Sequence, residues 1–372
     1  MALYPKENAF SLGNWATKIK LIMEDIYLKI CDLENIYLAY LKARKCKRYK
    51  DEILKYAKNI EKRLLEIYYE LKNKSYKHGE YYEFLVSDSK KRIIRAAPFK
   101  DRIVHHSLCN IIEPIFDKLF IFDSYACRKG KGLHKAIKRF KEFLRTIKLK
   151  NGLENYDNIY CLKGDIVKYF DSVDKEVLFE LIKRRIQDKD ALKIIKTILD
   201  SYIKGLPIGN LTSQLFANIY LHELDFYIKN TLKCKYYIRY MDDFIILDAD
   251  KKKLWEQYAL IKIFVFDNLK LRIDDKKTQL IPIKRGVTFL GFTIFPNKTW
   301  LRKSTIKRFQ KRTKKRMLDI DDVSEKLKLL VCSFLNWKPY YINGDAHVFS
   351  IRLFCKIGEK YDKDIWEWGY RI

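Results

Sequence analysis

The segment Lys235–Leu247, KYYIRYMDDFIIL, places two adjacent aspartates between two short apolar runs. Tyr and Ile predominate in these runs, and aromatic and β-branched residues favour strands. The short connection predicts an antiparallel hairpin with Tyr240, Met241, Asp242 and Asp243 at its tip. Adjacent carboxylates repel each other, and a divalent cation with oxygen ligands would relieve that repulsion. Taken alone, the motif favours an ordinary aspartate-rich β-turn.

A third aspartate belongs to another apolar segment. Residues Asn158–Phe170 are predicted to form a strand, and Asp165 lies in its second half. An acidic side chain in such a strand is expected only where solvent or a metal receives its charge. One carboxylate at a strand end and two in a hairpin turn form the arrangement that two-metal phosphoryl transfer requires. The sequence therefore predicts Asp165, Asp242 and Asp243 as catalytic residues.

Hydrophobic periodicity predicts separate helices and strands in the rest of the chain. Apolar residues recur every three or four positions over 51–71, which is typical of a helix. Alternation at Tyr82, Phe84 and Val86, followed by Arg92–Ala97, predicts a strand hairpin. A further helix is expected at Asp101–Phe120, with a kink at Pro114. Another should begin after an N-cap at Ser172 or Asp174, and a third after the loop Gly205–Gly209. The last is expected at Arg302–Met317, with Ser304 as its cap. This mixture indicates the α+β fold class.

The charge balance points to a polyanionic partner. The 372 residues include 76 Lys and Arg against 47 Asp and Glu, a net charge of +29, while 48% of residues are hydrophobic. That apolar content excludes a disordered tail, and the positive charge favours nucleic acid. A Lys-rich composition from an AT-rich genome accounts for part of the excess. Nine of the sixteen residues in Arg302–Met317 are basic and none is acidic, which predicts a helix that follows a phosphate backbone.

The cysteines and the first residues indicate an intracellular protein. The eight cysteines form no C-x-x-C pair, so they are expected to be reduced, and a structural zinc site is not expected. The start MALYPKENAF has no apolar core typical of a signal peptide. We therefore expect a soluble, cytoplasmic protein with no membrane association.

Seven segments, in their order along the chain, resemble the motifs of reverse transcriptases. The resemblance covers about residues 40–335 and rests on the segments 92–108, 123–137, 163–174, 205–225, 240–243, 269–279 and 287–295. It implies a right-hand polymerase with fingers, a palm containing an antiparallel sheet, and a helical thumb. The expected ranges are an N-terminal helical extension at 1–80, fingers at 81–158, palm at 159–296 with finger helices inserted at about 183–204, and thumb with C-terminal tail at 297–372.

The template motif narrows the resemblance. Group II intron and retron enzymes usually carry Gln-Gly-x-x-x-Ser-Pro, whereas this chain has Ile208, Gly209, Ser213 and Gln214 at the corresponding places. Ile for Gln and Gln for Pro resembles the reverse transcriptases of diversity-generating retroelements, which are bacterial, archaeal or phage-encoded. That resemblance implies copying of a template-repeat RNA into cDNA with errors at adenines, and a small basic accessory variability protein as partner. An Ile cannot hydrogen-bond near the nucleotide as a Gln can, so pairing geometry would be restrained less strictly; alternatively, Ile208 merely packs.

The same resemblance implies roles for individual residues. Two Mg²⁺ ions would be held by Asp165, Ile166, Asp242 and Asp243. The incoming dNTP would meet Arg92, Phe170, Gly209, Gln214 and Lys277, although Lys276 competes with Lys277 and Phe170 is otherwise a core aromatic. Phe170 would exclude a 2′-hydroxyl, and Ile208 and Arg92 would influence fidelity. Template RNA and cDNA would be bound by Arg128, Lys129, Lys131, Tyr240, Met241, Lys307, Arg308, Lys311, Arg312 and Lys315.

Other functions stay open from the sequence alone. One is a retroelement or defence-type reverse transcriptase of ordinary fidelity, and another is a non-catalytic RNA-binding scaffold. Three retained aspartates that repel one another argue against the scaffold, and Phe170 argues against an RNA-templated RNA polymerase. Residues 336–372 carry no motif that predicts a role.

Overall fold

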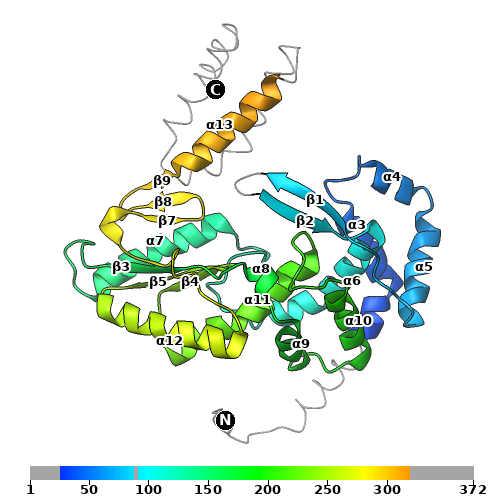
Figure 1. The fold of residues 1–372 in the computed structure, drawn as a ribbon, viewed down its shortest axis with the longest axis horizontal. Helices are drawn as coiled ribbons and strands as arrows, with labels where there is room; N and C mark the ends of the chain where they lie inside the picture. The colour runs from blue at the N-terminus through cyan, green and yellow to red at the C-terminus, as the bar shows by residue number, and fades with distance from the viewer. Residues whose placement is uncertain (1–25, 88–90, 319–372) are drawn as a thin grey trace, which may run out of the picture. The chain divides into compact units, whose positions relative to one another are not determined.

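The computed structural model describes residues 26–87 and 91–318, and they form two compact units (Figure 1). The first unit contains the described residues of Met1–Phe122 together with Ile166–Lys233 and Leu260–Ile273. The second contains Asp123–Asp165, Cys234–Ala259 and the described residues from Asp274 onward. Each unit combines segments from several of the four ranges expected above, and those ranges stay a prediction.

Helices built around α6 (Phe99–Asp117) form the core of the first unit. This helix packs against α2 (Ile26–Cys31), α3 (Leu33–Ala43) and α11 (Leu211–Phe226). Its apolar residues at three- and four-residue intervals are buried, which is the pattern of a helix enclosed by neighbours. The sequence predicted this helix, and Pro114 lies inside its last turn without ending it.

Shorter helices surround that core. They are α4 (Asp51–Ala57), α5 (Ile60–Lys72), α8 (Tyr169–Ser172), α9 (Lys175–Lys183) and α10 (Lys189–Asp200), and a π-helical turn, Tyr227–Thr231, extends α11. The expected single helix over 51–71 is wrong, because Asn59 leaves the helical conformation and separates α4 from α5. Asp174 is the N-cap of α9 and accepts hydrogen bonds from the N–H groups of Glu176 and Val177, both at 3.0 Å, as one of the two expected caps.

The first unit also contains the predicted hairpin. Strands β1 (Tyr82–Ser87) and β2 (Lys91–Ala96) pair antiparallel, with Phe84 opposite Ile94 and Glu83 opposite Arg95. The expected turn at 88–90 lies outside the described residues. Apolar side chains on this hairpin are exposed, including Tyr82 at 63% and Phe84 at 50%.

A four-stranded antiparallel sheet forms the centre of the second unit. Its order is β4 (Tyr237–Tyr240), β5 (Asp243–Asp248), β3 (Tyr160–Gly164) and β6 (Gln279–Pro282). The hairpin of β4 and β5 confirms the prediction, and Met241 takes the positive φ of 57° that a two-residue turn requires. The strand expected over Asn158–Phe170 is too long, because Lys168 adopts a left-handed conformation and α8 begins at Tyr169.

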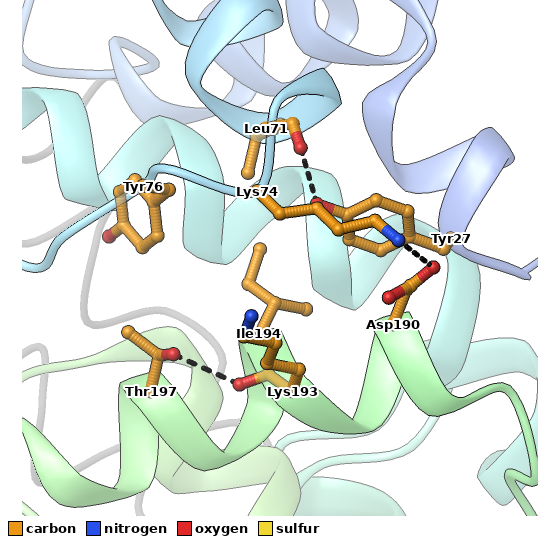
Figure 2. Close-up of a pocket in the computed structure, with 8 residues that line it drawn as sticks. All are labelled: Tyr27, Leu71, Lys74, Tyr76, Asp190, Lys193, Ile194 and Thr197. Atoms are coloured by element: carbon orange, nitrogen blue, oxygen red, sulfur yellow. Dashed lines mark hydrogen bonds and ion pairs between the residues drawn. The ribbon is translucent and has the colours of Figure 1, made fainter.

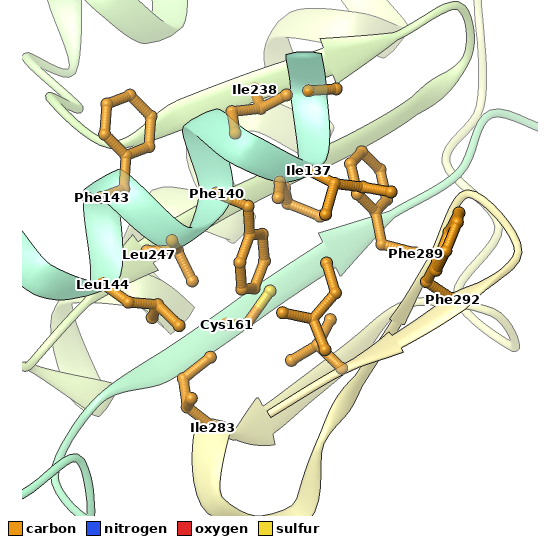
Figure 3. Close-up of a cluster of buried hydrophobic side chains, with 14 of the residues drawn as sticks. Ile137, Phe140, Phe143, Leu144, Cys161, Ile238, Leu247, Ile283, Phe289 and Phe292 are labelled. Atoms are coloured by element: carbon orange, nitrogen blue, oxygen red, sulfur yellow. The ribbon is translucent and has the colours of Figure 1, made fainter. Parts of the chain in front are cut away.

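Helix α7 (Leu133–Lys150) covers one face of this sheet (Figure 3). Phe140, Leu144, Cys161, Leu247 and Phe289 belong to a single buried cluster. A second sheet, β7 (Val287–Phe289), β8 (Phe292–Ile294) and β9 (Thr299–Leu301), contributes to the same cluster and follows a 3₁₀ turn at Ile283–Arg285. Strands β3, β4 and β5 are therefore backed by a continuous apolar core.

The basic helix α13 (Lys303–Leu318) joins that core through its apolar side. Phe309 is buried in the cluster and Ile306 packs against it, as the periodicity predicted. The helix begins at Lys303, so Ser304 lies within its first turn and is not the cap that was expected. A further long helix is α12 (Lys251–Leu269). Within residues 26–87 and 91–318, no helix combines the length and apolar character needed to cross a membrane.

Candidate active site

The three predicted catalytic aspartates lie at neighbouring strand ends of the second unit. The pairing of β3 with β5 ends at Gly164 opposite Phe244, so the next step of this register puts Asp165 beside Asp243. Asp242 occupies the turn between β4 and β5. The structure therefore brings together the three carboxylates from two separate segments of the chain.

The electrostatics of Asp242 reflect this proximity. Burial, together with the negative charges of Asp243 and Asp165, raises the pKa of its carboxyl to about 6, while Lys277 acts in the opposite direction. A cation that approached the three groups would lower the free energy of their ionised forms.

Lys277 already supplies part of that positive charge. Its Nζ lies 2.5 Å from Oδ2 of Asp165 and 3.0 Å from Oδ2 of Asp274. Hydrogen bonds to Asp165 and Asp274 raise the pKa of Lys277 well above its usual value. The neighbouring Lys276 contributes a backbone N–H to Asp274. Of the two lysines that the sequence left open, Lys277 is therefore the one in contact with Asp165, a predicted catalytic residue.

The donor atoms suit a hard divalent cation, although the site is arranged around Lys277. Across residues 26–87 and 91–318, no three His, Cys, Asp or Glu side chains are grouped closely enough to hold a metal as they stand. The carboxylates of Asp165, Asp242 and Asp243 offer only oxygen, which Mg²⁺ prefers. Ile166 has an apolar, buried side chain, so only its backbone carbonyl could serve as a ligand. The oxygen donors of these residues fit a hard divalent cation, and Lys277 occupies Oδ2 of Asp165 in this structure.

Two cationic residues that lie near the carboxylates were not identified from the sequence as part of the site. Arg239 is fully buried, and its Nη1 donates to the carbonyl of Met241 at 3.1 Å, so it supports the turn that carries Asp242. Lys163 donates to the carbonyl of Thr288 at 3.2 Å and lies 3.9 Å from a carboxylate oxygen of Asp243. Only the alternation of Lys163 and Asp165 along one strand face could have indicated such a role.

In the first unit, the loop Gly205–Gly209 is anchored at both ends. The N–H of Leu206 donates to the carbonyl of Phe170 at 2.7 Å, and the N–H of Arg95 donates to the carbonyl of Ile208 at 2.8 Å. Gly209 has a φ of +130°, and a Cβ there would lie 2.8 Å from the carbonyl oxygen of Arg95. Only glycine allows this close approach to β2.

The other predicted nucleotide-binding residues of this unit have partly or fully accessible side chains. Phe170 is half-buried beside the fully buried Tyr169, with ring centroids 5.6 Å apart. Arg92 is exposed on β2, and Gln214 is exposed on α11 next to the buried Ser213. Phe170 rather than Tyr169 is therefore the aromatic that a nucleotide could meet.

Two pockets of the first unit differ in size and charge. One has a volume of about 540 Å³ and is lined by Lys47, Lys50, Glu52, Tyr82, Phe84, Ile94, Ala96, Ala97, Arg102 and Gly209. The other, shown in Figure 2, has only about 50 Å³, and an ion pair of 2.6 Å between Lys74 and Asp190 spans it. The small pocket has room for little more than water.

The predicted nucleic-acid-binding residues of the second unit fall into two groups. Lys307, Lys311, Arg312 and Lys315 are exposed on α13, and Arg308 is half-buried. In the loop before α7, Arg128 donates to the carbonyl of Ser124 and Lys131 lies over the ring of Tyr125, so these residues also hold the loop together, while Lys129 is exposed. Tyr240 and Met241 are half-buried at the β4–β5 turn.

Two known bacterial proteins are similar to this chain in sequence. Protein YkfC of Escherichia coli (strain K12) is 27% identical over 248 residues, which cover 55% of this chain and 63% of that protein. The group II intron-encoded protein LtrA of Lactococcus lactis subsp. cremoris is 26% identical over 326 residues, covering 66% of this chain and 52% of that protein. This chain thus spans only about half to two thirds of the length of these relatives.

Solved structures show the same fold. A telomerase from Candida albicans, in complex with a fragment of telomeric RNA, superimposes with a TM-score of 0.50 over 79% of this chain and 61% of its own, at 10% identity. The apo telomerase from Candida tropicalis gives a TM-score of 0.50 over 69% of this chain and 52% of its own. The α+β polymerase fold predicted from the sequence is confirmed. The model of the family "Reverse transcriptase (RNA-dependent DNA polymerase)" matches residues 76–294, more than half of the chain, and the chain therefore belongs to the reverse transcriptase family.

Proposed function

We propose that this chain is an RNA-directed DNA polymerase that transfers nucleotides at Asp165, Asp242 and Asp243. The observation that carries this proposal is the convergence of three carboxylates at neighbouring strand ends, with Asp165 next after β3 and with Asp242 and Asp243 at the β4–β5 turn. Their negative charges repel one another. Two Mg²⁺ ions held by these side chains and the carbonyl of Ile166 would offset the repulsion. When bound, such ions activate a 3′-hydroxyl and stabilise the leaving pyrophosphate.

The chain's own residues bind the substrates and deliver a proton. Lys277, kept protonated by Asp165 and Asp274, is the proton donor for pyrophosphate. Arg92 pairs with the triphosphate, and Gly209 and Gln214 line the nucleotide. Phe170 lies under the sugar and excludes a 2′-hydroxyl, so deoxynucleotides are selected.

The larger pocket of the first unit fits an unpaired stretch of the RNA template. Lys47, Lys50 and Arg102 supply positive charge there, and the exposed rings of Tyr82 and Phe84 offer stacking surfaces. Cations along a groove combined with accessible aromatic rings are the usual means of holding single-stranded nucleic acid. On the second unit, the exposed lysines of α13 would contact the backbone of the RNA–cDNA duplex.

We further infer that the enzyme serves a diversity-generating retroelement and copies a template-repeat RNA with errors at adenines. The support is Ile208, a side chain without hydrogen-bonding atoms in a half-exposed position beside Gly209. A small basic accessory protein would then act with the enzyme; because both are basic, RNA would join them. The similarity to an intron-encoded protein favours the competing function, a retroelement reverse transcriptase of ordinary fidelity.

Primer extension on an RNA template separates these functions. The wild-type chain with Mg²⁺ and dNTPs is compared with the variant Asp242→Ala plus Asp243→Ala, and the products are sequenced. We expect extension only by the wild type, with errors concentrated opposite adenine. Even, low error would leave the polymerase and exclude the mutagenic role. No extension, with or without candidate RNA and accessory protein, would favour the RNA-binding scaffold.

A further inference from the structure

Arg95 of β2 connects the β1–β2 hairpin to the loop that carries Ile208. The backbone N–H of Arg95 donates to the carbonyl of Ile208 at 2.8 Å, and Gly209 lies against the carbonyl of Arg95. The peptide between Ile208 and Gly209 therefore lies along the edge of β2 that faces away from β1. Any movement of Arg95 is transmitted directly to Ile208.

The side chain of Arg95 is held by two contacts. Its Nε donates to Oε1 of Glu83 on the neighbouring strand at 2.7 Å, and its guanidinium carbon lies 4.8 Å from the ring centroid of Tyr202. The side chain of Arg95 is only 18% exposed, whereas that of Glu83 is 55% exposed. Water weakens the ion pair at so exposed a carboxylate, so the stacking on Tyr202 is the stronger restraint.

Tyr202 belongs to the segment that leads into the loop. Its ring meets the ring of Tyr81 edge-on at 6.0 Å, and the hydroxyl of Tyr81 lies 2.9 Å from Oγ of Ser201 and accepts from Asn210 at 3.1 Å. Residues on both sides of the loop are thus fixed to one aromatic cluster. The guanidinium of Arg95 connects this cluster to β2.

We propose that Arg95, through its stacking on Tyr202, is a positioning residue that fixes Ile208 and thereby sets the nucleotide affinity and the error rate. This inference rests on the polymerase function proposed above. Ile208 is half-buried and Gly209 is exposed, so small displacements of the loop alter what a nucleotide contacts. Since Ile208 has no polar atom of its own to bind a base pair, its influence depends on where the backbone holds it.

The test uses two disruptive variants and two conservative ones in the full chain. Tyr202→Leu removes the stacking ring and Tyr202→Phe keeps it; Arg95→Ala removes the guanidinium and Arg95→Lys keeps the charge without the planar group. For Tyr202→Leu and Arg95→Ala we expect KM for dNTP to rise about fivefold with kcat within about twofold. Misincorporation should rise opposite all four template bases, because a loosely held Ile208 restrains pairing less.

The conservative variants and the double variant establish the mechanism. Tyr202→Phe should behave as the wild type, and Arg95→Lys should fall in between. Combining Arg95→Ala with Tyr202→Leu should add little to either change, since both remove the contact between Arg95 and Tyr202. A lower kcat with unchanged KM and error spectrum would indicate loss of folded enzyme only, and would overturn the inference.

Hydrogen exchange distinguishes failure of the inference from failure of the proposed function. In Tyr202→Leu, the amide of Arg95 and those of residues 206–210 should exchange faster, while amides of β3 should not change. If wild-type protein does not extend primers but these amides respond, the polymerase function is refuted and the positioning contact is supported. If the amides keep wild-type rates, the positioning role is refuted whatever the activity.

Discussion

Gly164→Ala tests whether the end of β3 that precedes Asp165 depends on the absence of a side chain at position 164. A Cβ at Gly164 would lie 2.6 Å from Cε1 and 2.9 Å from Cε2 of Phe244, its partner across the sheet. Non-bonded carbons prefer about 3.5–4.0 Å, so the ring or the strand must shift by about 1 Å. Phe244 is only 1% exposed, and its ring has no solvent to move into. Because overpacked cores lose about 1–3 kcal/mol, we expect Gly164→Ala to cost about 2–3 kcal/mol of unfolding free energy.

Urea unfolding of the full chain measures this cost, and Phe244→Leu is the matched variant. Shortening the ring to Leu alone should cost about 1–2 kcal/mol through the cavity it leaves. In the double variant, the new methyl group enters that space, so the double variant should be no less stable than Phe244→Leu. The coupling energy between the two sites would then be about 2 kcal/mol. Primer extension should fall in Gly164→Ala and recover in the double variant, because Asp165 and Asp243 adjoin the two residues.

Two results would refute the overlap argument. One is a stability of Gly164→Ala within about 0.5 kcal/mol of the wild type, the range of changes without a structural cause. The other is simple addition of the two single costs in the double variant, which would mean that the methyl group and the ring do not compete for space.

Three further predictions concern charge. In EDTA, Asp242→Asn should stabilise the chain by about 2–3 kcal/mol at pH 7.5, because the folded wild type keeps this carboxylate ionised although its pKa is raised to about 6. In urea titrations, this difference in unfolding free energy should vanish as the pH falls through 6 toward 4. Mg²⁺ should raise the Tm of the wild type only. Lys277→Met should slow extension by about 10–100-fold yet tighten Mg²⁺ binding measured by calorimetry, whereas unchanged values are expected for Lys276→Met. Lys311→Gln on α13 should reduce the salt dependence of binding to an RNA–DNA duplex, so that the slope of log affinity against log salt falls by about one in magnitude. Lys252→Gln on α12 is the control, and equal slopes for the two variants would contradict a phosphate contact at Lys311.

Sequence patterns predicted best what depends on near neighbours in the chain. The alternation and the short connection in Lys235–Leu247 define a hairpin, and the structure has it in that place. The cap at Asp174 also follows a local rule, since its carboxylate meets N–H groups two and three residues later. Local patterns failed where a single residue interrupts an otherwise regular hydrophobic periodicity, as Asn59 does between α4 and α5.

Contacts between distant segments were beyond what a single sequence reveals. The backbone of Arg95 is hydrogen-bonded to that of Ile208, which lies more than a hundred residues later in the chain, and neither motif contains a signal that predicts this contact. Arg239 looks like one more basic residue in a basic chain, yet it is fully buried and supports the turn of Asp242. A charged residue inside a short apolar strand was the one available signal, since such residues are buried only when paired.

The cations beside the catalytic carboxylates explain how the site can fold before any metal binds. Asp165 has the ammonium of Lys277 at 2.5 Å, and Asp243 has that of Lys163 at 3.9 Å. These contacts reduce the repulsion among the carboxylates, while burial, together with the charges of Asp243 and Asp165, raises the pKa of Asp242 to about 6. A divalent ion at Asp165 would replace Lys277 there, and Asp274, whose carboxylate lies 3.0 Å from the same ammonium, would retain the lysine nearby. The affinity of the site for metal is therefore a difference between two ionic interactions, which is why removing Lys277 should tighten metal binding even as it slows the reaction.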